Sequence, residues 1–153
     1  MIPVTQTKVV VKNSAGDWVV HGNCYAAVIA SMLELPITEV PNVEVLFHVD
    51  DYLWNTVMDS FLMHKGYELS CDDRYKVFHP ELQIHGDAGD VNLLRDELKD
   101  DYYLVSGLSK RGVQHITIYQ NGKMVHDPHP TKEGIDTLER FESLRKIQNN
   151  THE

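Results

Sequence analysis

The sequence has few cysteines and no long hydrophobic run. Only Cys24 and Cys71 occur among its 153 residues, which is too few for a disulfide-stabilised scaffold. No apolar stretch approaches the roughly 20 residues that a membrane-spanning helix needs. The N-terminus lacks the basic start and apolar core of a signal peptide. These absences predict a cytoplasmic protein with no membrane partner.

Positive charge is also scarce. Asp and Glu outnumber Lys and Arg by 23 to 14, so the formal net charge is −9. A surface of this sign repels a phosphate backbone, and no stretch interleaves basic and aromatic residues as single-strand binding grooves do. We therefore expect no nucleic-acid partner. Repeats, low-complexity tracts and Gly/Ser linkers are lacking too, which predicts a single domain over residues 1–153 with a disordered tail at 148–153.

The spacing of apolar residues predicts helices first and strands afterwards. Helices are expected over residues 24–35, 50–65 and 90–99, and strands over 67–71, 75–78, 102–106, 113–119 and 123–127. The valines on either side of the turn cluster at residues 13–17 predict a hairpin near the N-terminus. The segment 135–147 fits both helix and strand. Helices followed by an antiparallel sheet make an α+β domain.

Cys24 begins the first predicted helix, directly after Gly22 and Asn23. Asn23 is a favoured N-cap residue. A thiol at a helix N-terminus lies at the positive end of the helix dipole, which predicts a lowered pKa. Gly22 would let a substrate backbone approach, and the free N–H groups of the first turn could hold an oxyanion. The alternative is that Cys24 is a small buried apolar residue, as most free cysteines are.

Two further residues could complete a catalytic site. His115 enters a predicted strand, and Asp127 ends the next one before Pro128. A carboxylate held in this way can orient a neighbouring imidazole and stabilise its cation. Taken singly, His115 could be a surface histidine, and Asp127 could simply start a turn. Cys71, beside Asp72, is expected to be a poor thiolate because nearby negative charge raises a thiol pKa.

At this point the chain resembles papain-like cysteine peptidases. The segment Gly22-Asn23-Cys24, followed by a helix of small residues, looks like their nucleophile segment. His115 on an apolar strand, with Asp-Pro on the next strand, is similar to the bacteriocin leader peptidases of ABC transporters. Small bacterial and phage proteins share the Gly-Asn-Cys helix and the His-Asp-Pro-His-Pro motif. The resemblance implies a papain-like α+β fold, a catalytic triad of Cys24, His115 and Asp127, a peptide or protein substrate, and no cofactor.

The resemblance also implies an oxyanion hole. In that superfamily a glutamine upstream of the nucleophile completes it, and Gln6 is the sole glutamine before Cys24. Leader peptidases have this glutamine six residues before the cysteine, where this chain has Trp18. For Gln6 to serve beside Asn23, residues 8–21 must therefore form an inserted hairpin.

Substrate binding and rival functions complete the hypotheses. Lys110, Arg111 and Gly112 precede His115 and could meet a substrate carboxylate, although an exposed charged loop also explains them. A zinc site is a rival, with His126, Asp127 and His129 as ligands and His115 or His21 completing a tetrahedron. A second rival is a papain-like binding module that no longer turns over. Deamidase and transglutaminase activities use the same triad and stay open.

The loop between the last two predicted strands decides whether His115 and Asp127 can meet. A two-residue turn without a bulge would send Asp127 to the other face of the sheet, because a one-residue slip reverses every side chain. A three-residue loop with Gly122 in the left-handed conformation would pair Tyr119 with Lys123 and bring both side chains to one face. The triad requires this turn or an equivalent bulge elsewhere in the hairpin, and we predict Gly122 at positive φ with Tyr119 opposite Lys123.

Overall fold

The computed structural model describes residues 1–20, 22–46, 49–82 and 88–148. The expected disordered tail falls almost entirely on residues 149–153, which lie outside the described residues. The helices are α1 (Cys24–Leu33), α2 (Asp51–His64) and α3 (Ala88–Leu98), with 3-10 turns η1 (Ile37–Glu39), η2 (Val43–Leu46), η3 (Asp73–Phe78) and η4 (Pro80–Leu82). The strands are β1 (Val11–Lys12), β2 (Trp18–Val20), β3 (Tyr67–Cys71), β4 (Tyr102–Leu108), β5 (Gln114–Gln120), β6 (Lys123–His126) and β7 (Thr137–Lys146).

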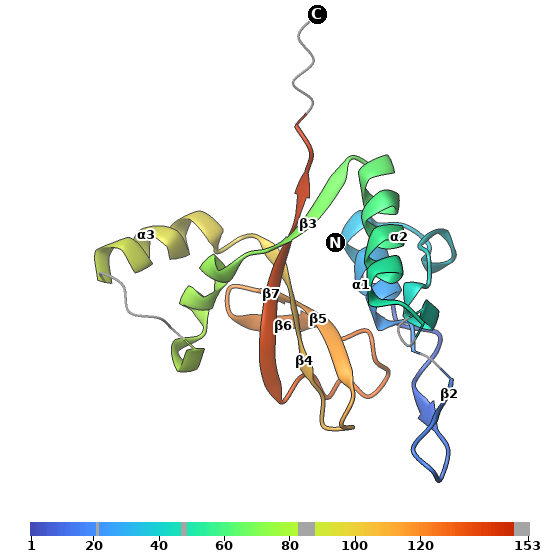
Figure 1. Cartoon of the computed structure of the whole chain (residues 1–153). Helices are drawn as coiled ribbons and strands as arrows, with labels where there is room; N and C mark the ends of the chain where they lie inside the picture. The colour runs from blue at the N-terminus through green and yellow to red at the C-terminus, as the bar shows by residue number, and fades with distance from the viewer. Residues whose placement is uncertain (21, 47–48, 83–87, 149–153) are drawn as a thin grey trace, which may run out of the picture.

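One antiparallel sheet organises the molecule. Its strand order is β3-β7-β4-β5-β6, and every neighbouring pair is antiparallel. In Figure 1, α1 and α2 lie on one side of this sheet, and α3 with η3 lies on the other. The buried side chains form two hydrophobic cores, one around α1 and one around Tyr103 and Phe141. The α+β class and the antiparallel sheet predicted from the sequence are therefore confirmed.

Helix α1 is the most deeply buried element of the first core. Its small residues, Ala26, Ala27 and Ala30, are at most 2% exposed, which lets the helix pack closely on β5. The helix ends at Leu33, slightly before the predicted end, because Glu34 takes the left-handed conformation with φ of 58°. The buried packing of α1 gives its first residue, Cys24, a fixed position beside the sheet.

One predicted strand is absent from the structure, and the segment that fitted both helix and strand is a strand. Residues 75–78 form part of the 3-10 turn η3 and not a strand, so that prediction was wrong. Asp72 accepts a hydrogen bond from the Arg74 N–H and so caps the turn, while the Tyr75 ring stacks on Tyr103 at 4.4 Å between centroids. The ambiguous segment at 135–147 contains the long strand β7, which pairs with both β3 and β4.

The turn between β5 and β6 also differs from the prediction. Gln120 pairs with Lys123, so the predicted partner Tyr119 was wrong. The two turn residues, Asn121 and Gly122, have φ of 51° and 78°. Positive φ at both positions is the geometry of a two-residue type I′ hairpin turn, for which Asn-Gly is the favoured sequence.

A bulge follows directly after this turn. Tyr119 pairs with Met124, but the next residue on β5, Ile118, pairs with His126. Val125 is therefore an extra residue on β6, and it shifts the register by one. Gly122 has the predicted positive φ, but the bulge that the triad requires lies at Val125, a position which the sequence did not indicate.

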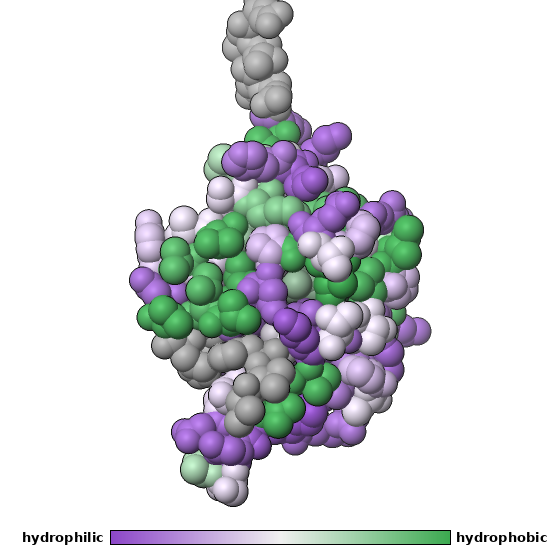
Figure 2. Space-filling model, turned by 90° about the vertical axis from the view of Figure 1, so that its right-hand side faces the viewer, coloured by the Kyte–Doolittle hydropathy of each residue, from purple (hydrophilic) through white to green (hydrophobic). Residues whose placement is uncertain are grey.

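The N-terminal hairpin stands apart from the main sheet. Strands β1 and β2 pair with each other, and the turn residues between them are exposed. The hairpin projects at the lower right in Figure 1, and its hydrophilic tip extends below the body in Figure 2. Among the described residues, none of the helices combines the length and apolar character needed to cross a bilayer.

Candidate active site

The N-terminal segment of residues 4–8 joins the start of α1 to the end of β6. The carbonyl of Val4 accepts a hydrogen bond from His126 Nε2 at 2.7 Å, and the Gln6 N–H donates to Pro128 O at 2.8 Å. On the other side, Asn23 Oδ1 accepts from the N–H groups of Thr7 and Lys8 at 3.0 and 2.9 Å. The segment thus fixes the residues beside Cys24 relative to those beside Asp127.

Asn23 occupies the N-cap position of α1, but its side chain makes no capping hydrogen bond. Its side-chain amide hydrogen-bonds residues 7 and 8 instead, and its Nδ2 donates to Thr7 Oγ1 at 2.8 Å. Asn23 is therefore the N-cap residue that the sequence predicted, but it caps the helix without a side-chain hydrogen bond. The Asn23 backbone N–H also donates to Lys8 O, at 3.2 Å, so both the backbone and the side chain of Asn23 hold the N-terminal segment, and the predicted oxyanion role of Asn23 gains no support from the geometry.

Gln6 lies beside the nucleophile segment, as an oxyanion role requires. Because the hairpin β1–β2 forms within the intervening residues, Gln6 can lie next to Gly22 although the two are far apart in the sequence. A Cβ placed on Gly22 would be 3.5 Å from Gln6 Nε2. That nitrogen donates to Lys8 O at 2.7 Å, which leaves its second N–H for a substrate. Gln6 Oε1 is buried without a hydrogen-bond partner among the described residues.

His115 and Asp127 form a buried pair. His115 Nε2 lies 2.7 Å from Asp127 Oδ1, and the two residues are 4% and 1% exposed. An ionised carboxylate can only accept, so Nε2 carries the hydrogen and Nδ1 carries the free lone pair. The Val125 bulge makes this contact possible. Continued past His126, the shifted register places Asp127 on the same face as His115.

Asp127 is held as an anion by three donors. Burial alone would raise its pKa, but hydrogen bonds from the His115 ring and from the N–H groups of His129 and Gly134 lower the pKa to about 2. The carboxylate is thus ionised at neutral pH. It can stabilise a positive charge on His115, which is the role of the acid in a catalytic triad.

Cys24 faces a carboxylate that the sequence did not suggest. Its Sγ lies 3.8 Å from Glu44 Oε2, and Glu44 Oε1 accepts the Tyr25 N–H at 2.6 Å. Burial raises the pKa of the Cys24 thiol, and Glu44 raises it further, whereas the backbone N–H groups of Ile116 and Tyr25 lower it; the net direction is well above the ordinary value. The predicted lowering of this pKa was therefore wrong, because burial disfavours the thiolate and the Glu44 carboxylate adds a negative charge beside it.

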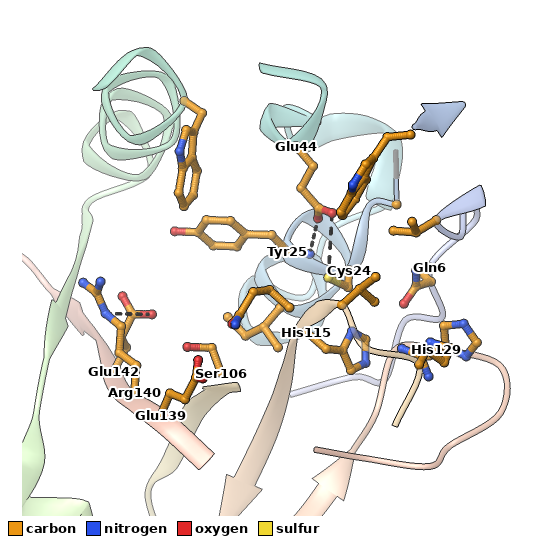
Figure 3. Close-up of a pocket in the computed structure, with 18 of the residues that line it drawn as sticks. Gln6, Cys24, Tyr25, Glu44, Ser106, His115, His129, Glu139, Arg140 and Glu142 are labelled. Atoms are coloured by element: carbon orange, nitrogen blue, oxygen red, sulfur yellow. Dashed lines mark hydrogen bonds and ion pairs between the residues drawn. The ribbon is translucent and has the colours of Figure 1, made fainter. Parts of the chain in front are cut away.

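A cavity of about 460 Å³ joins these groups. Figure 3 shows Cys24 and Glu44 on one wall, with His115, His129 and Gln6 around them. The Tyr25 and Trp54 rings, edge to face at 5.7 Å, form the side toward α2. A second polar group, Ser106, Glu139, Arg140 and Glu142, lines the opposite end in Figure 3. The structure thus brings Cys24 and His115 to one cavity, and Asp127 contacts His115 without lining the cavity itself.

The predicted substrate loop contributes one of its three residues. Arg111 lines the cavity, and its Nη1 lies 3.5 Å from Thr131 Oγ1. Lys110 and Gly112 are exposed, and Gly112 takes a φ of 74° within the loop. A contact to a substrate carboxylate can therefore come from Arg111, whereas Gly112 is explained by the turn.

Comparison of the chain with protein-family models, with curated proteins and with solved structures finds no match. The case for a function therefore depends on the geometry of this cavity.

The candidate zinc ligands are directed to different partners. His126 donates to Val4 O, His129 Nδ1 lies 2.8 Å from Thr131 Oγ1, and Asp127 accepts from His115. Within the part of the chain that the structure describes, no group of three His, Cys, Asp or Glu residues is arranged to hold a metal ion. His21, a further candidate ligand, lies outside the described residues.

Glu44 is the main site residue that sequence reasoning missed. It lies in the 3-10 turn η2, twenty residues after Cys24, among residues with no periodic pattern. Its contact with Cys24 depends on how η2 packs against α1. A carboxylate within a short apolar segment was the sole local signal, and on its own it indicates no partner.

Proposed function

We propose that the protein is a papain-like cysteine hydrolase, which cleaves an amide, peptide or thioester bond through an acyl-enzyme on Cys24. The observation that carries the proposal is the buried hydrogen bond from His115 Nε2 to Asp127 Oδ1, 2.7 Å long, beside a cavity that Cys24 also lines. Burying an imidazole and an ionised carboxylate costs desolvation free energy, so such a pair is weak as a device for stability alone. It is the arrangement that activates a nucleophile.

The chemistry follows from which atoms are free. His115 Nδ1 accepts the Cys24 proton, and Asp127 stabilises the resulting imidazolium. The thiolate then attacks the substrate carbonyl, and the leaving amine or thiol departs with the proton from His115. Water, deprotonated by the same nitrogen, releases the acid and restores Cys24. An amine in place of water would give a transglutaminase, and a glutamine side chain as substrate would make the reaction a deamidation.

Gln6 supports the proposal as part of the substrate site. A buried acceptor without a partner costs free energy, so the lone Oε1 of Gln6 fits a site that receives a hydrogen bond from a substrate N–H. The second N–H on Nε2 can reach the oxyanion together with backbone N–H groups at the start of α1.

A peptidyl epoxide tests the function directly. Opening the epoxide ring forms an S–C bond and breaks a C–O bond, and the alkoxide needs a proton that the His115 imidazolium would supply. We expect one epoxide per chain on Cys24, located by peptide mass spectrometry, and at least about 10²-fold slower labelling in His115→Ala. Simple alkylation is less decisive because Cys71 is exposed. Labelling confined to Cys71, or equal labelling of Cys24 without His115, would contradict the proposal.

Gln6→Ala tests the oxyanion hole separately. Hydrolysis of a p-nitrophenyl ester should fall by about 10²-fold, since the loss of one oxyanion donor has this order of effect. Alkylation of Cys24 by iodoacetamide forms no oxyanion and should stay within about two-fold. Gln6→Glu, which keeps the shape but loses the donor, should behave like Gln6→Ala. An unchanged ester rate in both variants would assign the oxyanion to backbone N–H groups alone.

A further inference from the structure

The Glu44 carboxylate covers the first turn of α1. One oxygen accepts the Tyr25 N–H at 2.6 Å and the other lies 3.8 Å from Cys24 Sγ, as the two dashed lines in Figure 3 show. The thiol is the donor in this contact, because an ionised carboxylate has no hydrogen to give. The nucleophile's proton is therefore already held by a group outside the proposed triad.

We propose that Glu44 is a fourth catalytic residue, which holds the proton on Cys24 in the resting protein and lets His115 take it once the carboxylate is neutralised or withdrawn. The inference rests on the proposed function for the role of His115. The contact between Glu44 and Cys24 is independent of that role, which allows the two ideas to be tested separately.

The physical basis is the repulsion between two neighbouring anions. Two acidic groups this close in a buried site cannot both ionise at their ordinary pKa values. Burial raises the pKa of Glu44 to about 7, although the Tyr25 N–H and the Cys24 thiol lower it. Above about pH 7 the ionised carboxylate opposes formation of the thiolate. Below that pH the carboxyl is neutral, the repulsion is gone, and its O–H can donate to the sulfur.

Other charged groups also face this part of the cavity. Those that line the cavity are Tyr25 on α1, Arg111 and His115 on the β5 side, His129 after β6, and Glu139, Arg140 and Glu142 on β7. Asp59 on α2 acts electrostatically on Tyr25. Arg140 and Glu142 pair with each other at 3.6 Å, and Asp127 accompanies His115. Glu44 is the charged side chain that contacts the thiol itself, so changing its charge should have the largest effect on the thiol's ionisation.

Glu44→Gln is the direct test, in a Cys71→Ser background that leaves one thiol. Glutamine keeps the shape and can still accept the Tyr25 N–H, but it carries no charge. The rate of alkylation by iodoacetamide, in which an S–C bond forms and iodide leaves, is measured from pH 5 to 9 by intact mass. At pH 8 we expect at least a 10-fold faster rate in Glu44→Gln. We also expect an inflection near pH 7 in the Cys71→Ser parent that is absent in the variant.

The control is Glu39→Gln, which makes the same chemical change on an exposed residue of η1. Its rate should stay within two-fold of the parent at every pH. Equal rates in Glu44→Gln and the parent, or a parent profile that follows one ionisation with no inflection near pH 7, would overturn the role of Glu44. If Glu44→Gln does not fold, the profile of His115→Ala in the same background keeps the test decisive: an inflection near pH 7 that persists without His115 supports the role of Glu44, and its loss overturns that role.

His115→Ala, in the same background, separates the two ideas. Slower alkylation of Cys24 in this variant supports the triad, whatever Glu44 does. A faster rate in Glu44→Gln combined with no effect of His115→Ala would retain the Glu44 contact and contradict the proposed function. The reverse pattern would retain the function and remove Glu44 from the mechanism.

Discussion

Replacing Asp127 by asparagine is expected to slow epoxide labelling of Cys24 and ester hydrolysis by about 10³-fold or more. The carboxylate accepts from His115 Nε2 and the His129 N–H on one oxygen, and from the Gly134 N–H on the other. Asparagine has one oxygen and one NH₂ group in these places. If its oxygen faces His115, its NH₂ opposes the Gly134 N–H, and the imidazolium loses its counter-ion.

The other orientation of the amide is no better. With the NH₂ toward His115, the ring nitrogen Nε2 must become the acceptor, so the hydrogen moves to Nδ1. Nδ1 can then no longer take the Cys24 proton. The first orientation weakens the base by removing the counter-ion of the imidazolium, and the second removes the base altogether. The measurement is the second-order rate of labelling at pH 7. A loss smaller than about ten-fold would show that Asp127 only supports the fold.

The same substitution predicts a pH-dependent change in stability. The pKa of Asp127 is about 2 in the folded protein, below the value of about 3.9 of an unfolded chain. Ionisation of a group whose pKa is lowered on folding stabilises the protein above the unfolded pKa, and this contribution is lost as the pH falls through the folded pKa. It amounts to about 2–3 kcal/mol at neutral pH and should disappear between about pH 4 and pH 2.

Urea unfolding of the parent and of Asp127→Asn from pH 7 to pH 2.5 measures this contribution. The parent should be more stable at pH 7, and the difference should shrink toward pH 2.5. Asp136→Asn removes a carboxylate from an exposed position and should change the free energy of unfolding by less than about 0.5 kcal/mol at any pH. A difference between parent and Asp127→Asn that does not vary with pH would mean that folding does not lower the pKa of Asp127.

The sequence predicted those parts of the fold that depend on local patterns. Leu53, Val57 and Phe61 lie one helical turn apart and α2 forms there, and Asn121-Gly122 forms a tight turn between two strands. Such elements depend on periodicity and on backbone preferences that neighbouring residues set. Residues 75–78 show the limit, because their apolar pattern also fits a 3-10 turn once Asp72 caps it.

The candidate site was predictable in its members but not in its geometry. Cys24, His115 and Asp127 could each be named from their positions at the ends of elements. Whether His115 and Asp127 share a face depended on Val125, which gives no sign of a bulge in the sequence. The contact of Glu44 with Cys24 depended on packing between η2 and α1. Register and packing are set by the whole fold, so a single sequence leaves them open.

Gly107→Ala is expected to cost at least about 4 kcal/mol of stability, a value that belongs to severe core disruptions. A Cβ on Gly107 would lie 1.9 Å from the carbonyl oxygen of Thr137 and 2.9 Å from Ile135 Cγ2. The first of these is a backbone atom of β7, so no side-chain rotation can relieve the clash. Relief requires β7 to move away from β4, with which it pairs along the sheet.

The matched control separates this clash from the ordinary cost of replacing a glycine. Gly16 has a φ of 86°, and a Cβ placed on it would have nothing within 4 Å, so Gly16→Ala should cost only about 1 kcal/mol of backbone strain. Gly107 also pairs with His115 across β4 and β5, so separating β4 from β7 should disturb the candidate base as well. Thermal and urea unfolding of both variants measure the costs. Equal stability of the two would mean that β4 and β7 tolerate a side chain at Gly107, and that the pairing of β4 with β7 there is looser than the structure indicates.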